Sequence, residues 1–106
     1  MPLSKSFLFE PDLQSLADCG LVISHPARII ILRSLEDAVS SYEEICALIP
    51  LRPTTISQHL RILERSRLIK RVAYPSKIAG YALDNDNYAI AKARLMAFSA
   101  GEKLMD

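Results

Sequence analysis

The chain has 106 residues, half of them hydrophobic, which predicts one globular domain over residues 1–106 and excludes a large multi-domain enzyme. No window approaches the roughly 18 apolar residues of a membrane span, and the N-terminal residues lack a signal-peptide pattern, so we expect a cytoplasmic protein without a membrane partner. The 13 Lys and Arg residues nearly balance the 12 Asp and Glu. Residues 51–77, however, hold seven cations and one acid, so their net charge is +6 against −5 for the remainder of the chain. This asymmetry predicts a surface that binds a polyanion.

Apolar spacing and helix-ending residues predict three helices in the first half of the chain. Apolar residues at helical spacing after Pro11 predict a short helix over residues 11–22. Pro26 suits the first turn of a second helix, whose many apolar residues predict burial on most sides. Ser41 and Glu44 have the spacing of a capping box, which predicts a third helix that Pro50 ends.

A fourth helix is predicted to have two contrasting sides. Pro53 opens it, and its apolar residues lie at helical spacing, so residues 41–66 are predicted to form a helix-turn-helix pair. The opposite side is expected to be polar, with short or hydrogen-bonding side chains close to a helix N-terminus. These residues are Thr54, Thr55, Ser57, Gln58, His59 and Arg61.

The remainder of the chain predicts a β-hairpin and a last helix. Residues 68–83 alternate between apolar and polar side chains on both sides of a turn at Pro75–Lys77. Asp84 and its neighbours can cap a helix over residues 86–100 that is apolar on more than one side. About five helices with one small hairpin indicate a mostly α-helical winged helix-turn-helix, in which residues 68–83 form the wing.

Three segments carry a resemblance to a known family: L-V-I-S-H-P-A-R-I-I-I-L-R-S-L (21–35), E-I-C-A-L-I-P-L-R-P-T-T-I-S-Q-H-L-R-I-L (44–63) and L-I-K-R (68–71). The chain resembles the ArsR family of bacterial winged-helix repressors, which usually show P-x-R-x-x-I-L-x-x-L in the second helix and S-T-V-S-x-H-L-x-x-L in the recognition helix. The matching residues are Pro26, Arg28, Ile31, Leu32 and Leu35, then Thr54, Thr55, Ile56, Ser57, His59, Leu60 and Leu63.

A recognition helix that enters the major groove end-on brings its first turns to the base edges, while cations beside it hold phosphates. For His59 a backbone or positioning role and a surface or half-buried histidine both stay open. We expect Arg28 and Arg33 to cover apolar surface with their stems rather than to touch DNA. The residues expected to contact bases are Thr54, Thr55, Ser57 and Gln58, and those expected to contact phosphates are Arg52, Arg61 and Lys77.

The resemblance also implies a homodimer built from the first helix, residues 11–22, and the last, residues 86–100. Surplus apolar surface on the last helix favours the same conclusion, although its alanines could instead pack on their own domain. The expected interface residues are Leu13, Leu16, Ile90, Ala93 and Ala97.

Many relatives of this family respond to metals, and the resemblance allows their sites to be checked. The matching positions for the C-x-C-D/E site of the third helix hold Ser41 and Glu43, and no histidine follows His59 for the site on the last helix. Cys46 lies on an apolar stripe, where a buried thiol is expected, and Cys19 has no C-x-x-C partner. We therefore predict no metal site and no cofactor, and no feature identifies an effector.

One position departs from the family pattern. Arg67 stands where the family usually has a glycine after the recognition helix. The backbone there is therefore expected to be either less left-handed or strained by a non-glycine residue.

Three functions compete at this point. The first is a sequence-specific transcriptional regulator, expected to repress by binding a palindromic operator in double-stranded DNA as a homodimer. The second is a winged-helix interaction module whose basic face meets an acidic protein partner. The third, an enzyme, is disfavoured because the chain has only three glycines and no G-x-S-x-G motif or phosphate-binding glycine loop.

Overall fold

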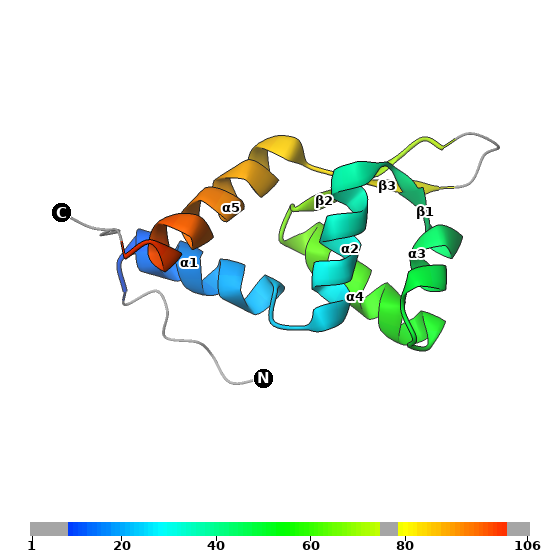
Figure 1. The fold of residues 1–106 in the computed structure, drawn as a ribbon, viewed down its shortest axis with the longest axis horizontal. Helices are drawn as coiled ribbons and strands as arrows, with labels where there is room; N and C mark the ends of the chain where they lie inside the picture. Colours follow the sequence, from blue (N-terminus) through cyan, green and yellow to red (C-terminus); the bar gives the residue numbers. More distant parts are fainter. Residues whose placement is uncertain (1–8, 75–78, 102–106) are drawn as a thin grey trace.

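The computed structural model describes residues 9–74 and 79–101 (Figure 1). These residues form the predicted winged helix-turn-helix, with five helices and a three-stranded antiparallel sheet. In chain order the elements are α1 (Pro11–Val22), α2 (Pro26–Asp37), β1 (Ser40–Ser41), α3 (Tyr42–Leu48), α4 (Pro53–Arg65), β2 (Ile69–Val72), β3 (Gly80–Leu83) and α5 (Asn85–Ser99).

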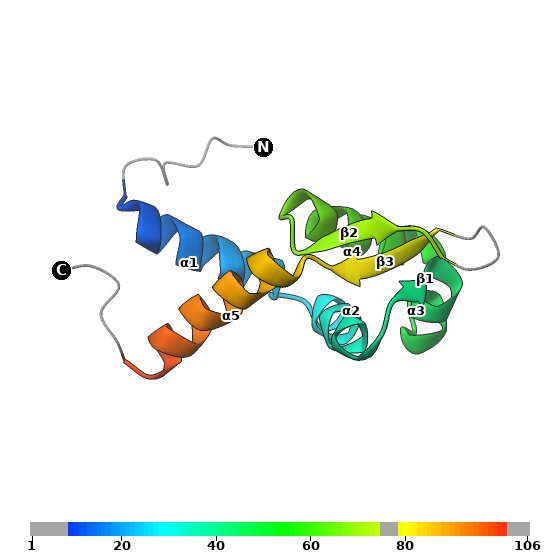
Figure 2. The same ribbon diagram turned by 90° about the horizontal axis from the view of Figure 1, so that it is seen from above.

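The described elements form two groups along a molecule with principal extents of 50 × 30 × 22 Å. Figure 2 shows α1 and α5 packed together at one end, and the sheet with α2, α3 and α4 at the other. No single helix in the described ranges has the length and apolarity needed to cross a membrane; α1 and α2 meet that criterion only as a pair bent by 94°.

The sheet has the strand order β1-β3-β2, so β3 is its central strand. Ile69 pairs with Leu83 in the predicted hairpin, and Ser40 of β1 pairs with Tyr81 on the other edge of β3. No sequence pattern predicts β1, because a strand of two residues has no alternation of its own. The expected turn at Pro75–Lys77 lies outside the described residues.

The core lies between α2, α3, α4 and the sheet. Its largest fully buried side chains are Ile31, Ile45, Ile56, Leu60 and Leu63. Burying one such side chain contributes roughly 1.5–3 kcal/mol relative to leaving it in water. This core fixes α4 from its apolar side, as the predicted stripe requires.

The helix boundaries follow local capping chemistry. Ser41 Oγ accepts from the Glu44 amide at 3.1 Å, and the Glu44 carboxylate accepts from the Ser41 amide at 2.9 Å, which confirms the predicted capping box of α3. The Asp84 carboxylate accepts from the Asn87 amide at 3.2 Å, so α5 begins at Asn85, one residue earlier than predicted.

The end of α4 has a left-handed residue that is not glycine. Arg67 has φ 63°, while the Leu68 amide donates to the Leu63 carbonyl at 3.2 Å and the Arg67 amide donates to the Glu64 carbonyl at 3.0 Å. These two bonds form a Schellman motif, in which glycine is the usual left-handed residue. The backbone at Arg67 is therefore left-handed and carries a side chain, which agrees with the second expectation, a position strained by a non-glycine residue.

Candidate nucleic-acid interface

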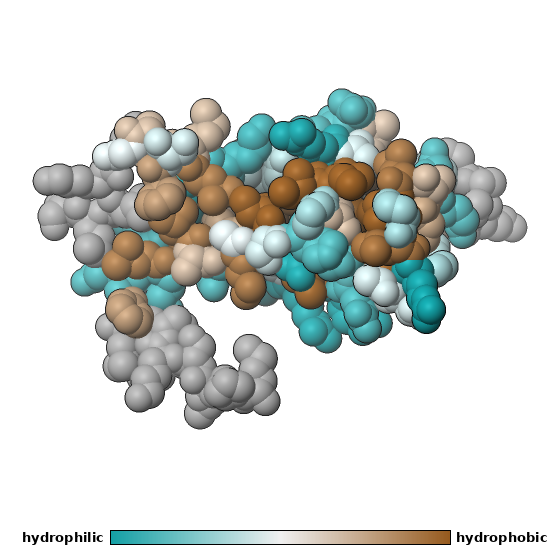
Figure 3. All heavy atoms as spheres, turned by 60° about the horizontal axis from the view of Figure 1, so that its bottom comes forward, coloured by the Kyte–Doolittle hydropathy of each residue, from teal (hydrophilic) through white to brown (hydrophobic). Residues whose placement is uncertain are grey.

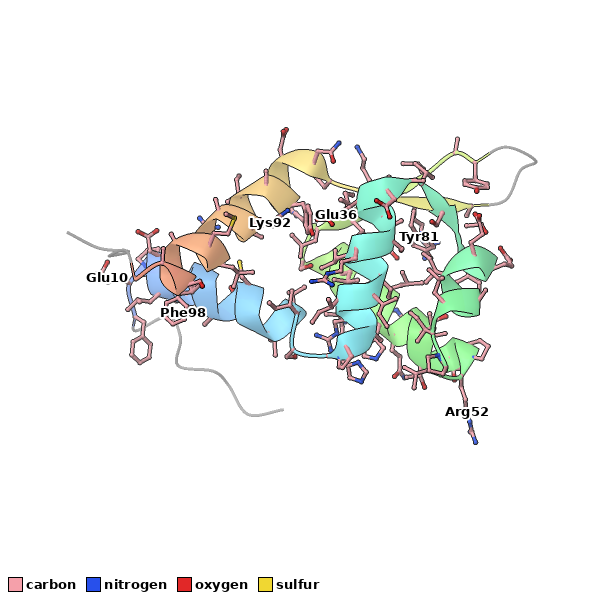
Figure 4. The ribbon with its side chains drawn as sticks, in the orientation of Figure 1. Glu10, Glu36, Arg52, Tyr81, Lys92 and Phe98 are labelled. Carbon is pink, nitrogen blue, oxygen red and sulfur yellow. The ribbon has the colours of Figure 1, made fainter. Side chains whose placement is uncertain are left out.

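The first two turns of α4 present a polar surface to solvent. Thr54, Gln58 and Arg61 are exposed, and Arg52 projects away from the molecule just before the helix (Figure 4). Arg52 is the N-cap residue of α4 but makes no side-chain hydrogen bond to it. The amides of the first turn thus keep the partial positive charge and the donors that favour a phosphate or a base-edge acceptor.

Two further members of the predicted polar side are half-buried. They are Thr55 and Ser57, which are only partly exposed to solvent. The Tyr42 hydroxyl donates to the Pro53 carbonyl at 3.0 Å and also lies 3.0 Å from the Ser57 hydroxyl. Tyr42 of α3 therefore fixes the first turn of α4 through two hydrogen bonds.

The prediction that His59 lies on the exposed polar side is wrong. Its side chain is only 8% exposed, and Arg28 Nε donates to its Nδ1 at 3.1 Å. The sequence spacing already indicates that His59 is buried, because it lies on one helix side with three apolar residues. Ile56, His59, Leu60 and Leu63 follow the i, i+3, i+4, i+7 pattern. His59 thus joins the buried stripe, and α4 is held from both α2 and α3.

Electrostatics around His59 favour its neutral form. Burial, followed by the charges of His25 and Arg28, lowers the pKa of this imidazole from its usual value. The His25 and His59 ring centroids are 4.3 Å apart with planes tilted by 42°. An imidazole that accepts at Nδ1 carries its single proton on Nε2, which is the form that this arrangement requires.

The wing adds further cations beside α4. Lys70 and Arg71 are exposed on β2, and Arg71 forms an ion pair with Glu64 of α4 at 3.2 Å. That pair joins β2 to α4, but because both groups are partly solvated it contributes little stability. Lys77, the predicted phosphate contact of the wing, lies outside the described residues.

A second surface, formed by α1 and α5 and called here the α1/α5 surface, is apolar. Ile90 is 50% exposed, Met96 67% and Phe98 64%, and Leu13 on α1 is also exposed. In Figure 3 brown side chains run from the α1 and α5 end of the molecule toward its middle. Of the predicted interface residues, Leu16 and Ala97 are half-buried, while Leu13, Ile90 and Ala93 are exposed. All five residues belong to α1 and α5, the two helices that pack together at one end of the molecule.

The α1/α5 surface is joined to the rest of the fold through Glu36 of α2. Its carboxylate accepts from the Tyr88 hydroxyl at 2.6 Å and lies 3.4 Å from Lys92 Nζ, both on α5 (Figure 4). Burial, followed by this bond, raises the pKa of Tyr88 to about 12, so the phenol remains a donor at neutral pH. The contact orients α5 relative to α2.

The positions that correspond to metal ligands in related proteins have other roles here. Ser41 caps α3, as described above, and Glu43 is exposed in the first turn. Within residues 9–74 and 79–101, no three His, Cys, Asp or Glu side chains are grouped so that they could hold a metal ion. Both cysteines are free thiols, and burial raises the pKa of Cys19, which lowers its reactivity.

Comparison with known proteins places this geometry among bacterial regulators. Residues 25–71, from the start of α2 to β2, match the family described as "Bacterial regulatory protein, arsR family". No curated protein has a significantly similar sequence.

Solved structures extend the similarity beyond that segment. A possible transcriptional regulator for arsenical resistance is 26% identical, with a TM-score of 0.67 over 76% of this chain and 83% of that one. The transcriptional repressor BigR from Xylella fastidiosa is 25% identical, with a TM-score of 0.65 over 86% of this chain and 90% of its own. HlyU from Vibrio cholerae is 22% identical, with a TM-score of 0.66 over 80% of this chain and 92% of its own, and shares the fold.

Proposed function

We infer that this chain, which belongs to the ArsR family of DNA-binding transcriptional regulators, is a repressor that binds a palindromic operator as a homodimer. Its family consists of regulators and not of enzymes. The observation that carries the proposal is the exposed, uncapped N-terminal end of α4, which is held rigidly from α2 and α3. A rigid helix end with short polar side chains and free amides suits insertion into the major groove.

The proposal assigns two kinds of contact to this surface. Side chains in the first turns of α4 contact base edges, and Gln58 can bond adenine through two hydrogen bonds. Cations around the helix contact phosphates, which orient the protein without selecting a sequence. The proposed base contacts are Thr54, Thr55, Ser57 and Gln58, the proposed phosphate contacts are Arg52, Arg61 and Lys77, and His59 supports the helix from its buried side.

The α1/α5 surface supports the proposed homodimer. An exposed cluster of large apolar side chains on two adjacent helices is more stable when a second protomer covers it. In this dimer a two-fold axis passes through the α1/α5 surface and places the two α4 helices on successive major grooves. The proposed interface residues are Leu13, Leu16, Ile90, Ala93 and Ala97. The operator must then have two matching half-sites about one helical turn apart. Such a regulator acts in the bacterial cytoplasm, where the DNA is.

Selection of bound sequences from a random DNA pool tests the proposal. We expect enrichment of one palindromic sequence, bound by two protomers and preferred over random DNA by roughly 10³-fold or more. Affinity should fall steeply between 50 and 200 mM salt, because each neutralised phosphate releases a counterion. A pool that remains random after selection would contradict the proposal and leave an acidic protein as the partner of the basic face.

A further inference from the structure

Arg28 joins three helices through one guanidinium group. Its Nη1 donates to the carbonyls of Leu21 at 2.9 Å and Val22 at 3.4 Å, both in the last turn of α1. Its Nε donates to Nδ1 of His59 on α4 at 3.1 Å. The last turn of α1 has no basic residue of its own, so Arg28 of α2 supplies the positive charge that a helix C-terminus favours. One side chain thus connects the proposed dimer helix with the recognition helix.

His25 completes the cluster from the start of α2. Its Nδ1 accepts from the Ala27 amide at 3.0 Å, so the ring caps α2 while it packs on His59. Both imidazoles act as acceptors at Nδ1. Among the described residues, the charged or titratable groups that act on His59 are His25 and Arg28, and α1 faces the cluster with the carbonyls of Leu21 and Val22.

The chemistry of the Arg28–His59 bond depends on protonation. A guanidinium can only donate, and a protonated imidazole also donates from both nitrogens. A proton on Nδ1 of His59 therefore removes the hydrogen bond and places a second positive charge beside the guanidinium. The two groups must then separate, and α4 loses its direct link to α1.

We propose that Arg28 and His59 are positioning residues for DNA recognition, whose mutual hydrogen bond holds α4 at the angle to α1 that operator binding needs and is released when His59 is protonated. This rests on the proposed function, because α1 defines the two-fold axis and α4 contacts the DNA. Simultaneous insertion of two α4 helices depends on their mutual orientation, whereas contact with phosphates of random DNA does not.

The pH dependence has a sign that separates this proposal from simple electrostatics. Adding positive charge to a DNA-binding protein strengthens its attraction to phosphates, so electrostatics alone predicts tighter binding at low pH. The positioning role predicts weaker operator binding as the pH falls below about 6.5, the usual value for histidine, toward the lowered pKa of His59. Binding to random DNA should weaken far less.

The experiment compares operator and random DNA affinities of four proteins between pH 8 and pH 5.5 at constant ionic strength. Wild type should lose about 2-fold to 10-fold of its operator affinity across this range, because one proton that binds with a pKa below 6.5 can cost at most about 11-fold at pH 5.5. His59→Asn keeps an acceptor near the position of Nδ1 but cannot be protonated, so its operator affinity should be close to wild type at pH 8 and independent of pH. Arg28→Lys keeps the charge but loses the planar fork, and should lose about 5-fold to 30-fold of its operator affinity already at pH 8.

Arg33→Lys is the matched control, because Arg33 is exposed on the same helix. It should bind operator as wild type does at every pH. Thermal unfolding of each variant at pH 8 shows whether it is folded, and the His59 pKa, measured by NMR without DNA, should lie below 6.5 in wild type and rise in Arg28→Lys.

The outcomes separate the two proposals. If wild type prefers no sequence over random DNA at pH 8, the proposed function fails. If the preference exists but neither pH nor Arg28→Lys changes it, or if operator binding tightens at low pH, the positioning role is overturned while the proposed function stands.

Discussion

The hydroxyl groups of Tyr42 and Ser57 lie 3.0 Å apart, and the Tyr42 hydroxyl also donates to the Pro53 carbonyl at 3.0 Å. Because the single phenol proton goes to Pro53, the Ser57 hydroxyl must donate to Tyr42. Only the acceptor lone pairs of Ser57 then remain for DNA. Ser57 is therefore suited to the amino groups of adenine or cytosine rather than to the acceptor atoms of guanine or thymine.

Replacement of Tyr42 by Phe tests this relationship. The variant loses both hydrogen bonds, and we expect the free energy of unfolding to fall by about 0.5–1.5 kcal/mol for each. Sequence selection should also relax at the base pair contacted by Ser57, because its hydroxyl can then donate as well as accept. Urea unfolding and repeated DNA selection measure the two effects. Unchanged unfolding and an unchanged selected sequence would contradict the assignment.

A charge on the α1/α5 surface should dissociate the proposed dimer. Ala93 is exposed on α5, so Ala93→Glu adds a carboxylate without disturbing the core of the protomer. We expect analytical ultracentrifugation to show a dimeric wild type and a folded, monomeric variant with reduced operator affinity. Ala47→Glu, the same change at an exposed alanine of α3, should leave the dimer intact. A monomeric wild type at micromolar concentration, or a dimeric Ala93→Glu variant, would show that the interface lies elsewhere.

Glycine at position 67 should stabilise the protein. A side chain in the left-handed conformation costs roughly 1–2 kcal/mol, and the greater entropy loss of glycine on folding offsets about 0.5–1 kcal/mol of the gain. We therefore expect Arg67→Gly to raise the free energy of unfolding by roughly 0.5–1 kcal/mol. Arg67→Ala removes the same charge but keeps the Cβ, so it should give no such increase. Urea midpoints with unchanged slopes distinguish strain from charge as the cause.

Metal ions should not release this protein from DNA. Ser41 and Glu43 stand at the positions that correspond to thiolate ligands in metal-responsive relatives, and Ser41 is engaged in capping α3. Zn(II), Cd(II) and As(III) at modest excess are therefore expected neither to bind stoichiometrically nor to change operator affinity. Equilibrium dialysis and a DNA titration measure these effects. Binding of one ion per protomer that Cys46→Ser abolishes would refute the expectation.

Local chemistry made much of this fold predictable. The capping box of Ser41 and Glu44 places the start of α3, and the prolines at positions 11, 26 and 53 place the starts of α1, α2 and α4, because each acts within one helical turn. The conformation of Arg67 was predictable only in part. Its departure from glycine was visible in the sequence, but the alternative between a relaxed and a strained backbone was decided by the bonds to Leu63 and Glu64.

Features that depend on distant partners were missed. β1 has only two residues and exists through its pairing with β3, about forty positions further along the chain. The residue type of His59 favours the polar side of α4, whereas its spacing from Ile56 and Leu63 puts it on the buried stripe. Arg28, 31 positions away on α2, makes that buried polar site favourable, and no local pattern relates the two residues.

The affinity of Gln58→Ala for operator and for random DNA, measured beside wild type and Arg61→Ala, tests the central claim that α4 selects a sequence. Gln58 and Arg61 are both exposed on this helix. We predict that Gln58→Ala lowers operator affinity by about 1–3 kcal/mol with little effect on random DNA, because a base-edge contact carries discrimination. Arg61→Ala should weaken both by similar factors, as expected for a phosphate contact. An equal loss on operator and random DNA for Gln58→Ala would contradict the account.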